Sequence, residues 1–317
     1  MSAKNSNEQI KDFELNYSSD LAQKVRPNLF IIGAMKAGTT SLQKYLNTHP
    51  DVFMCEPKEP CYFVHPRELS WPKIEKLKLW KDEERYLALF QKSQNAKIIG
   101  EASTAYTKFP LVTNIPERIY QFNPEARFIY VLRDPIERTI SHYLHEVRQG
   151  NEYNDMLTAI MKQPLYGSVS NYENQLRQFL NYFDLDQFFI FTFEEMIENT
   201  LESVKRIFDW LSIDGSFSPP NLEQKSHTTP DKFYLKSKFY RMRYSFPLNK
   251  IANLLPTKVR KVGLKTLVKE VDRSVELAQK EAVIEYLQPI QRSQVEQLSS
   301  LIHRDFPEWK TLSGTNN

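Results

Sequence analysis

The chain has 317 residues, of which 41% are hydrophobic and 26% are charged, and its formal net charge is +3. These values are typical of an ordinary globular protein that buries one large core, or at most two small ones. The sequence also excludes a membrane-spanning helix, because no apolar run approaches the ~18 residues that such a helix needs. The polar stretch 1–26 lacks the apolar segment of a signal peptide, so we expect a cytoplasmic protein.

The first predicted elements are a strand, a tight loop and a helix within residues 29–48. An apolar run ends at Gly33, a second glycine follows at Gly38, and two threonines and a serine (39–41) precede a helical pattern. We expect these hydroxyl residues to cap the helix. Such a junction directs backbone N–H groups and a helix N-terminus at one point, which predicts a cradle for a phosphate or sulfate.

This loop differs from the nucleotide-binding pattern G-x-x-x-x-G-K-[ST]. Thr39 stands where that pattern has lysine, and the only nearby lysine is Lys36, inside the loop. No clear second-strand aspartate is present to hold the magnesium ion of ATP or GTP hydrolysis. The loop therefore favours a substrate anhydride whose leaving group is stabilised by charge neutralisation alone. The alternative is a P-loop kinase.

Two cysteines, Cys55 and Cys61, follow the first helix. Neither their number nor their spacing suits a zinc site, and no histidine pair completes one, so we predict no metal centre. Two buried thiols in a reducing compartment are favoured over a disulfide.

Strands and helices alternate along the remaining chain. After a short strand at 52–54 and an irregular segment at 57–72, we predict the following: helix near 85–90, strand 97–101, helix 112–122, strand 127–133, helix 136–148, helix 172–183, strand 188–193, helix 200–211 and further helix up to 304. This order predicts an α/β protein with a P-loop-like three-layer fold, in which helices flank a central parallel β-sheet. Ligands bind at the carboxyl ends of such strands, which places Lys36, Glu101 and Arg133 on one rim.

We expect a single domain at 27–317, preceded by a polar extension (1–26) and ending in a mostly helical part (212–317). Within that part, the segment 225–273 carries 13 Lys or Arg against 3 Asp or Glu, a local charge of 13 − 3 = +10. Two interpretations stay open for this segment. It is either a solvated basic face or a positive wall beside an anionic cofactor, an acceptor or a membrane surface.

Two motifs resemble those of sulfotransferases that use 3′-phosphoadenosine 5′-phosphosulfate (PAPS). The stretch Gly33–Ser41, with His-Pro at 49–50 and Lys-Glu-Pro at 58–60, is similar to the 5′-phosphosulfate loop of that family. The stretch 129–143 is similar to its 3′-phosphate motif. Residues 100–106 and 115–119 resemble the heparan-sulfate type and its bacterial relatives, and the resemblance covers about 27–212.

The resemblance implies a PAPS-dependent sulfotransferase that releases 3′-phosphoadenosine 5′-phosphate (PAP). Lys36 would neutralise the leaving oxygen, and Arg133 with Ser141 would hold the 3′-phosphate. The remaining expected cofactor contacts are loop residues for the 5′-phosphate and two aromatic candidates for adenine: Ala37, Gly38, Thr39, Thr40, Ser41, Tyr172 and Phe193.

Glu59 aligns with the general base of the heparan-sulfate type, and His65 is the alternative because other sulfotransferases use histidine. The heparan-sulfate type carries a lysine after the glutamate of its middle motif, where this chain has Ala102. Glu101 is expected to orient an acceptor, hold Lys36 or form a buried ion pair. His49 is expected to be structural.

The acceptor is expected to be the hydroxyl or amine of a small molecule, such as a bacterial metabolite, with a saccharide or glycolipid as the alternative. No nucleic acid partner is indicated. The alternative outside catalysis is a nucleotide- or anion-binding protein that contacts membranes through 225–273.

Overall fold

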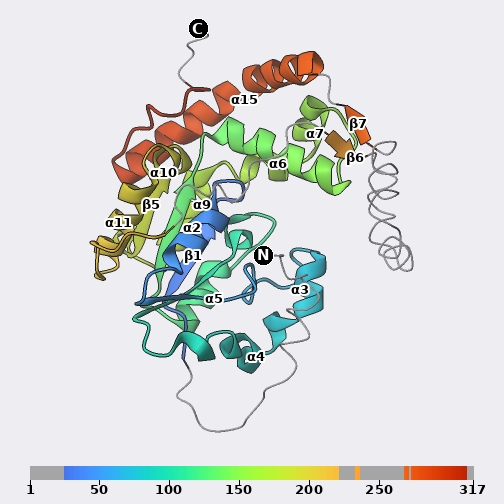
Figure 1. Cartoon of the computed structure of the whole chain (residues 1–317). Coiled ribbons are helices and arrows are strands. Elements are labelled where there is room, and N and C mark those ends of the chain that lie inside the picture. Colours follow the sequence, from blue (N-terminus) through green and yellow to red (C-terminus); the bar gives the residue numbers. More distant parts are fainter. Residues whose placement is uncertain (1–24, 221–232, 236–267, 271–272, 313–317) are drawn as a thin grey trace, which may run out of the picture.

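A five-stranded parallel sheet is the centre of the computed structural model, which describes residues 25–220, 233–235, 268–270 and 273–312 (Figure 1). Its strands lie in the order β2 (Val52–Met54), β3 (Ile98–Ala102), β1 (Leu29–Gly33), β4 (Arg127–Leu132) and β5 (Phe188–Thr192). Every neighbouring pair is parallel. The predicted parallel sheet is therefore confirmed, and each strand lies within a residue or two of its expected bounds.

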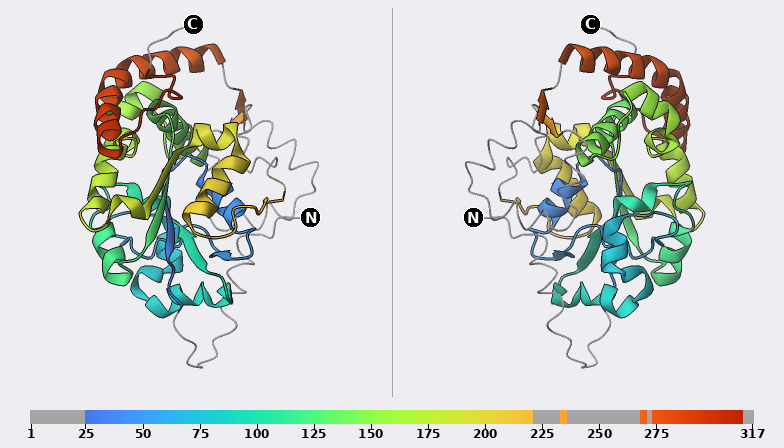
Figure 2. Two further views of the ribbon diagram at one scale, coloured as in Figure 1. Left: turned by 90° about the vertical axis from the view of Figure 1, so that its left-hand side faces the viewer. Right: turned by 90° about the vertical axis from the view of Figure 1, so that its right-hand side faces the viewer.

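The central strands are buried over nearly their whole length. All five residues of β1 are buried, as are the last five of β4. Isoleucine, phenylalanine and valine fill these strands without alternation, as expected where helices cover both faces of a parallel sheet. Figure 2 shows the sheet edge-on between the two helical layers.

The helices of the two layers pack in pairs. On one face α2 (Thr39–Leu46) contacts α11 (Thr200–Trp210), and on the other α5 (Ile115–Phe122) contacts α9 (Tyr172–Leu180). The shorter helices are α3 (Pro72–Leu77), η2 (Leu79–Lys81), α4 (Glu83–Ala88), η3 (Gln91–Ser93), η4 (Thr104–Thr107), α7 (Met156–Lys162), α8 (Pro164–Ser168), η5 (Leu185–Gln187) and α10 (Phe193–Glu198).

A second, smaller core lies where α15 (Arg273–Ile302) crosses α6 (Pro135–Gln149) and α7. Ile136 and Ile140 of α6 pack there with Val283 and Leu287 of α15. This contact fixes the helix that follows β4, so it also fixes the residues at the carboxyl end of that strand.

The C-terminal part differs from the expected run of helix. Two three-residue strands, β6 (Phe233–Leu235) and β7 (Val268–Glu270), pair antiparallel. They are distant in sequence and too short for a periodic pattern, so only their pairing defines them. Most of the basic segment 225–273 and nearly all of the extension 1–26 lie outside the described residues.

After α15 the chain returns to the sheet. Trp309 is buried against Phe306, with 4.0 Å between the ring centroids, and its indole N–H donates to Glu194 on α10. Thr311 donates from its N–H and its hydroxyl to Asp134 at the start of α6. Among the described helices, none combines the length and apolar character that crossing a bilayer requires.

Candidate active site

The loop after β1 forms the N-terminus of α2. Gly38 is the N-cap of this helix at φ 82°, and no side chain caps it, which corrects the expected threonine or serine cap. A Cβ at Gly38 would lie 2.5 Å from the Met196 side chain and 2.9 Å from Phe193, so only glycine fits. Since the hydroxyls of Thr39, Thr40 and Ser41 are not used for capping, they remain free to contact a ligand.

Several N–H groups of this loop are available to an anion. No hydrogen bond to a described residue is present for the N–H groups of Gly38, Thr39 and Thr40. Ala37 and Ser41 differ, because their N–H groups donate to Ala34 O and Gly38 O. Ala37 is also fully buried, so the prediction that it contacts the cofactor is not supported.

Lys36 occupies the bend of the loop in the left-handed region, at φ 74°. Burial lowers the pKa of its ammonium, and the charges of Arg148 and Arg133 lower it further. Within the described part of the chain, no carboxylate lies within ion-pair distance of this ammonium. Its charge is therefore compensated weakly, as suits a group that meets an anionic ligand.

Arg133 extends from the end of β4 across to this loop. Its Nη1 donates to Lys36 O at 3.1 Å, and its guanidinium carbon lies 5.1 Å from the Phe193 ring centroid. Its carboxylate neighbour is Glu137 at 3.8 Å, one turn along α6. An ion pair with Asp134, the alternative role for this arginine, is not formed, because Asp134 caps α6 and accepts from Thr311.

Tyr172 does not reach the cavity, contrary to its expected role at adenine. It is 1% exposed, and its hydroxyl donates to Arg133 O at 2.7 Å and accepts from Arg133 N–H at 3.3 Å. Tyr172 therefore holds the Arg133 backbone in place through these two hydrogen bonds. Phe193, the other aromatic candidate, does line the cavity.

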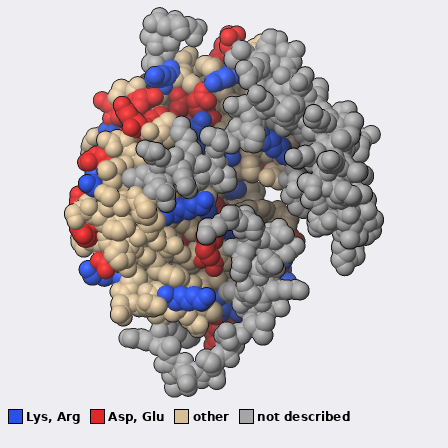
Figure 3. Space-filling model, in the orientation of Figure 1, with Lys and Arg blue, Asp and Glu red and all other residues tan. Residues whose placement is uncertain are grey.

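A cavity of about 1910 Å³ collects the predicted residues from distant segments. Its walls include residues of the loop, the irregular segment 57–72, η4, α6, α10 and α11, among them Lys36, Gly38, Thr39, Thr40, Ser41, Glu59, Arg133, Ser141 and Phe193. Figure 3 shows acidic side chains gathered over α15, whereas Lys and Arg atoms lie beside the central hollow.

Glu59 is held firmly at the cavity wall. It takes the left-handed conformation at φ 59°, its N–H donates to Ala102 O, and its carboxylate accepts from Thr104 N–H at 2.9 Å and Thr104 Oγ1 at 3.0 Å. The Lys58 ammonium is 2.9 Å away. Burial alone would raise the pKa of this carboxyl, but Lys58, Lys108 and the Thr104 hydroxyl outweigh it and hold the pKa below its usual value.

His65 lies outside the cavity wall, which corrects its proposed role as the alternative base. Its ring packs edge-on against Trp80, and its Nδ1 accepts from Arg67 N–H at 3.1 Å. His49 is structural as predicted, since it is buried and bonds Asp51 N–H and Asp214 O.

Glu101 is not on the rim but fully buried beneath it. Its carboxylate accepts from Tyr86 Oη at 2.8 Å, Tyr106 Oη at 2.7 Å and Ser103 Oγ at 2.5 Å. It neither holds Lys36 nor forms an ion pair, so those expectations are wrong. Burial raises its pKa to about 7, against the effect of the three hydroxyl donors.

Several residues of the cavity were not predicted from the sequence. Lys73 and Lys108 carry no motif, and they join the site only through the folding of α3 and of the turn after η4. His145 was detectable, because it lies four residues after Ser141 and therefore on the same face of α6. Burial, with the charges of Lys36 and Arg148, lowers the pKa of His145 to about 4, so this imidazole is neutral at pH 7.

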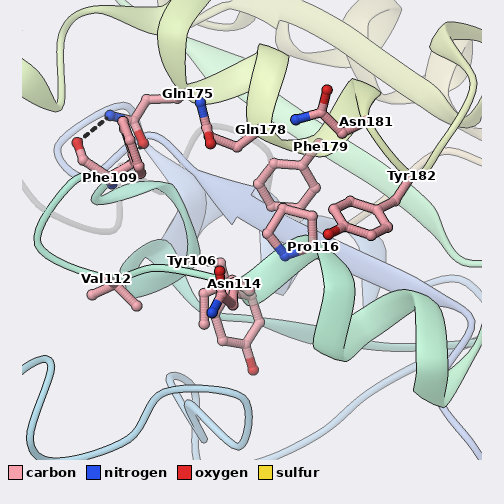
Figure 4. Close-up of a pocket in the computed structure, with 11 residues that line it drawn as sticks. Tyr106, Phe109, Val112, Asn114, Pro116, Gln175, Gln178, Phe179, Asn181 and Tyr182 are labelled. Carbon is pink, nitrogen blue, oxygen red and sulfur yellow. Dashed lines mark hydrogen bonds between the residues drawn. The ribbon is translucent and has the colours of Figure 1, made fainter.

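A second pocket, of about 90 Å³, lies between α5 and α9 (Figure 4). Amide and aromatic side chains such as Gln178, Asn181 and Tyr182 surround it, and Gln175 binds the backbone of Phe109 through both ends of its amide. None of the predicted site residues lies there, so the large cavity is the candidate active site.

A parallel sheet whose first loop presents N–H groups, a lysine and a facing arginine is typical of a P-loop-like fold, and these groups suit a phosphorylated ligand. Residues 27–218 match the model described as the sulfotransferase family. The chain belongs to this family.

Named relatives agree with this assignment. The chain is 36% identical over 119 residues to the membrane-associated sulfotransferase kil1 of Dictyostelium discoideum, covering 37% of this chain and 22% of the relative. It is 28% identical over 247 residues to human carbohydrate sulfotransferase 15, covering 59% of this chain and 44% of the relative. The chain thus spans less than half the length of these two curated relatives.

A solved structure supports the fold over most of the chain. The sulfotransferase from Alicyclobacillus acidocaldarius superposes with a TM-score of 0.65 at 25% identity, covering 90% of this chain and 99% of that one. The predicted α/β architecture with a P-loop-like sheet is confirmed.

Proposed function

We propose that the protein is a PAPS-dependent sulfotransferase that moves the sulfuryl group from PAPS to a hydroxyl or amine and releases PAP. The observation that carries this proposal is the convergence of four separate segments on one cavity. Lys36, Glu59, Arg133 and Ser141 all line it, and each matches the family pattern. Membership of the sulfotransferase family supports the same reaction.

The residues at the start of α2 would hold the 5′ end of PAPS. The N–H groups of Gly38, Thr39 and Thr40, with the helix dipole, favour a phosphate there. Lys36 would place its ammonium at the bridging oxygen, where negative charge develops as the S–O bond to phosphate breaks.

Arg133 and Ser141 would bind the 3′-phosphate. A guanidinium can grip phosphate with two parallel hydrogen bonds, and Ser141 stands two turns along the helix that follows Arg133. Phe193, beneath the guanidinium, offers a ring face to adenine.

Glu59 would remove the proton of the acceptor. As the acceptor oxygen or nitrogen forms its bond to sulfur, its proton passes to the carboxylate and the electron pair of the breaking S–O bond stays on PAP. Because its pKa is lowered, Glu59 is ionised at neutral pH and can accept this proton.

The acceptor is proposed to be a small molecule or a sugar. A cavity of about 1910 Å³ can hold PAPS together with such a group. We also propose a cytoplasmic location, which localisation of a tagged protein in cells would test.

The decisive experiment is a thermal-shift panel with PAP, PAPS, ATP and GTP, the last two with magnesium. A ligand at 100 times its dissociation constant stabilises the folded state by about 2.7 kcal/mol, so selective binding is visible. We expect PAP and PAPS to raise the melting temperature more than the triphosphates. A larger shift with magnesium ATP would favour a kinase instead, although Thr39 occupies the position of the kinase-type lysine.

A further inference from the structure

The acceptor end of the cavity carries an excess of positive charge around one carboxylate. Lys58, Lys73 and Lys108 line the wall beside Glu59. Lys58 pairs directly with this carboxylate. Two ammonium groups therefore remain for one carboxylate that is already neutralised.

These two lysines are only partly exposed. The side chain of Lys73 is partly buried, and its ammonium donates to Lys58 O. Lys108 is also partly buried, and within the described ranges it forms no ion pair and no hydrogen bond from its ammonium. An ammonium withdrawn from water without a partner is costly, unless a ligand supplies the opposite charge.

Burial lowers the pKa of both lysines, and in both the strongest opposing influence is the charge of Glu59. Both ammonium groups therefore lie within electrostatic reach of the proposed base. The other carboxylates of the wall accept hydrogen bonds from neighbouring residues: Glu146 accepts from the Asn151 amide, and Glu152 accepts from the N–H groups of Tyr153 and Asn154. The charge of Glu146 also raises the pKa of Lys108, but less than the charge of Glu59 does.

The position of Ala102 agrees with this arrangement. Ala102 is buried, and its carbonyl accepts from Glu59 N–H, so a side chain at 102 begins next to the base. Lys108, six residues later in the chain, brings an ammonium to the same neighbourhood, since the charge of Glu59 raises its pKa.

We propose that Lys73 and Lys108 form a subsite for an anionic group of the acceptor, close to the hydroxyl or amine that Glu59 deprotonates. The acceptor class is then a molecule bearing a carboxylate, sulfate or phosphate near its reacting group, rather than a neutral alcohol or phenol. This inference rests on the proposed function, since it assumes that Glu59 faces the acceptor.

The test uses the full chain saturated with PAP and two matched pairs of probes. Ligand-observed NMR titrations measure the affinities of D-glucuronate against D-glucose, and of 4-hydroxybenzoate against 4-hydroxybenzamide. We expect the anion of at least one pair to bind at least ten times more tightly than its neutral partner, because a hydrogen bond to a charged group contributes about 1.5–3 kcal/mol. This preference should weaken as salt is added.

Variants then assign the preference to the subsite. Lys108→Met should lower the affinity for the anion about tenfold and leave the neutral partner unchanged, whereas Lys108→Arg should keep the preference. Lys73→Met should act in the same direction as Lys108→Met. Lys92→Met, on an exposed position outside the cavity wall, is the matched control and should behave as the wild type.

Three outcomes would overturn the subsite. They are equal affinities within both pairs, binding of none of the probes, and a preference for the anion that survives in both Lys108→Met and Lys73→Met. PAP thermal shifts separate this failure from failure of the proposed function. A wild-type protein that PAP does not stabilise contradicts the function, while an intact PAP shift without anion preference contradicts only the inference.

Discussion

At the scale of single residues, Lys36 is the group that the proposed transfer needs most. Lys36→Ala should cut turnover of PAPS by roughly 10²–10³, as loss of one key charge-stabilising donor does in other enzymes. Turnover is measured as PAP formed with the best acceptor of the probe panel. Lys44→Ala, on an exposed position of α2 outside the cavity wall, is the control, and equal rates of the two variants would contradict the role of Lys36.

Glu59 can be tested apart from nucleotide binding. Glu59→Gln keeps the shape of the side chain and its acceptor for Thr104 but cannot take a proton, so the rate should fall by about 10²–10⁴. The PAP dissociation constant, measured by calorimetry, should stay within a factor of two or so, since Glu59 makes no proposed contact with PAP. A fully active variant would mean that another group is the base.

The hydroxyl of Thr104 helps to set the pKa of Glu59. Thr104→Val removes one donor to the Glu59 carboxylate and leaves the backbone donor in place. Because that hydroxyl helps to lower the pKa of Glu59, its loss should raise this pKa and shift the acid limb of the kcat/KM profile to higher pH. Thr104→Ser should restore the wild-type profile. An unmoved acid limb in Thr104→Val, with a lower rate at every pH, would indicate a purely structural role.

At the scale of elements, the site depends on how the start of α6 is held. The strand β4 ends at Leu132, and Asp134 caps α6 while accepting from Thr311 near the C-terminal end of the described chain. Tyr172 on α9 fixes the intervening Arg133 backbone. Arg133 is thus oriented by two segments whose supporting residues, Tyr172 and Thr311, lie outside the cavity wall.

Thr311→Val tests this arrangement. The change removes the hydroxyl bond to Asp134 at 2.6 Å and keeps the N–H bond. If the lost hydrogen bond contributes a net of about 1 kcal/mol to holding Arg133 in place, PAP should bind about fivefold more weakly, with kcat nearly unchanged. Thr113→Val, which removes a hydroxyl bond to Glu68 far along the chain, is the matched control. If both variants bind PAP like the wild type, the C-terminal return does not support Arg133.

At the scale of the whole molecule, Glu101 should give the folded state a distinctive pH dependence. Its folded pKa of about 7 lies above the ordinary value of 4.5, so the folded protein binds more protons than the unfolded chain between these values. The contribution of Glu101 to stability therefore falls as pH rises from about 4.5 to 7, by an amount on the order of 3 kcal/mol.

The variant Glu101→Gln removes this titration while retaining an acceptor for the two tyrosine hydroxyls. Its free energy of unfolding, from urea titrations between pH 5 and 8, should fall less steeply than that of the wild type. Parallel pH dependences of the two proteins would show that Glu101 titrates in its usual range.

The sheet was predictable because parallel strands carry continuous apolar runs, such as 29–32 and 127–132. The cradle was predictable because two glycines bracket it. The exact helix cap was not, since only a positive φ at Gly38 assigns it there. Tyr172 and His65 were misplaced because residue type says nothing of the direction of a side chain. Lys73 and Lys108 could not be found, because long-range folding alone brings them to Glu59.

The return of residues 304–312 to β5 and α6 has a consequence for biosynthesis. The sheet and both of its helical layers precede this segment in the chain, so they can form while translation continues. Thr311 and Trp309 leave the ribosome after the whole sheet, and until then Arg133 lacks one of its two supports. A nascent chain stalled before residue 304 should therefore have a folded sheet and yet retain PAP poorly, so nucleotide capture would follow the folding of the sheet.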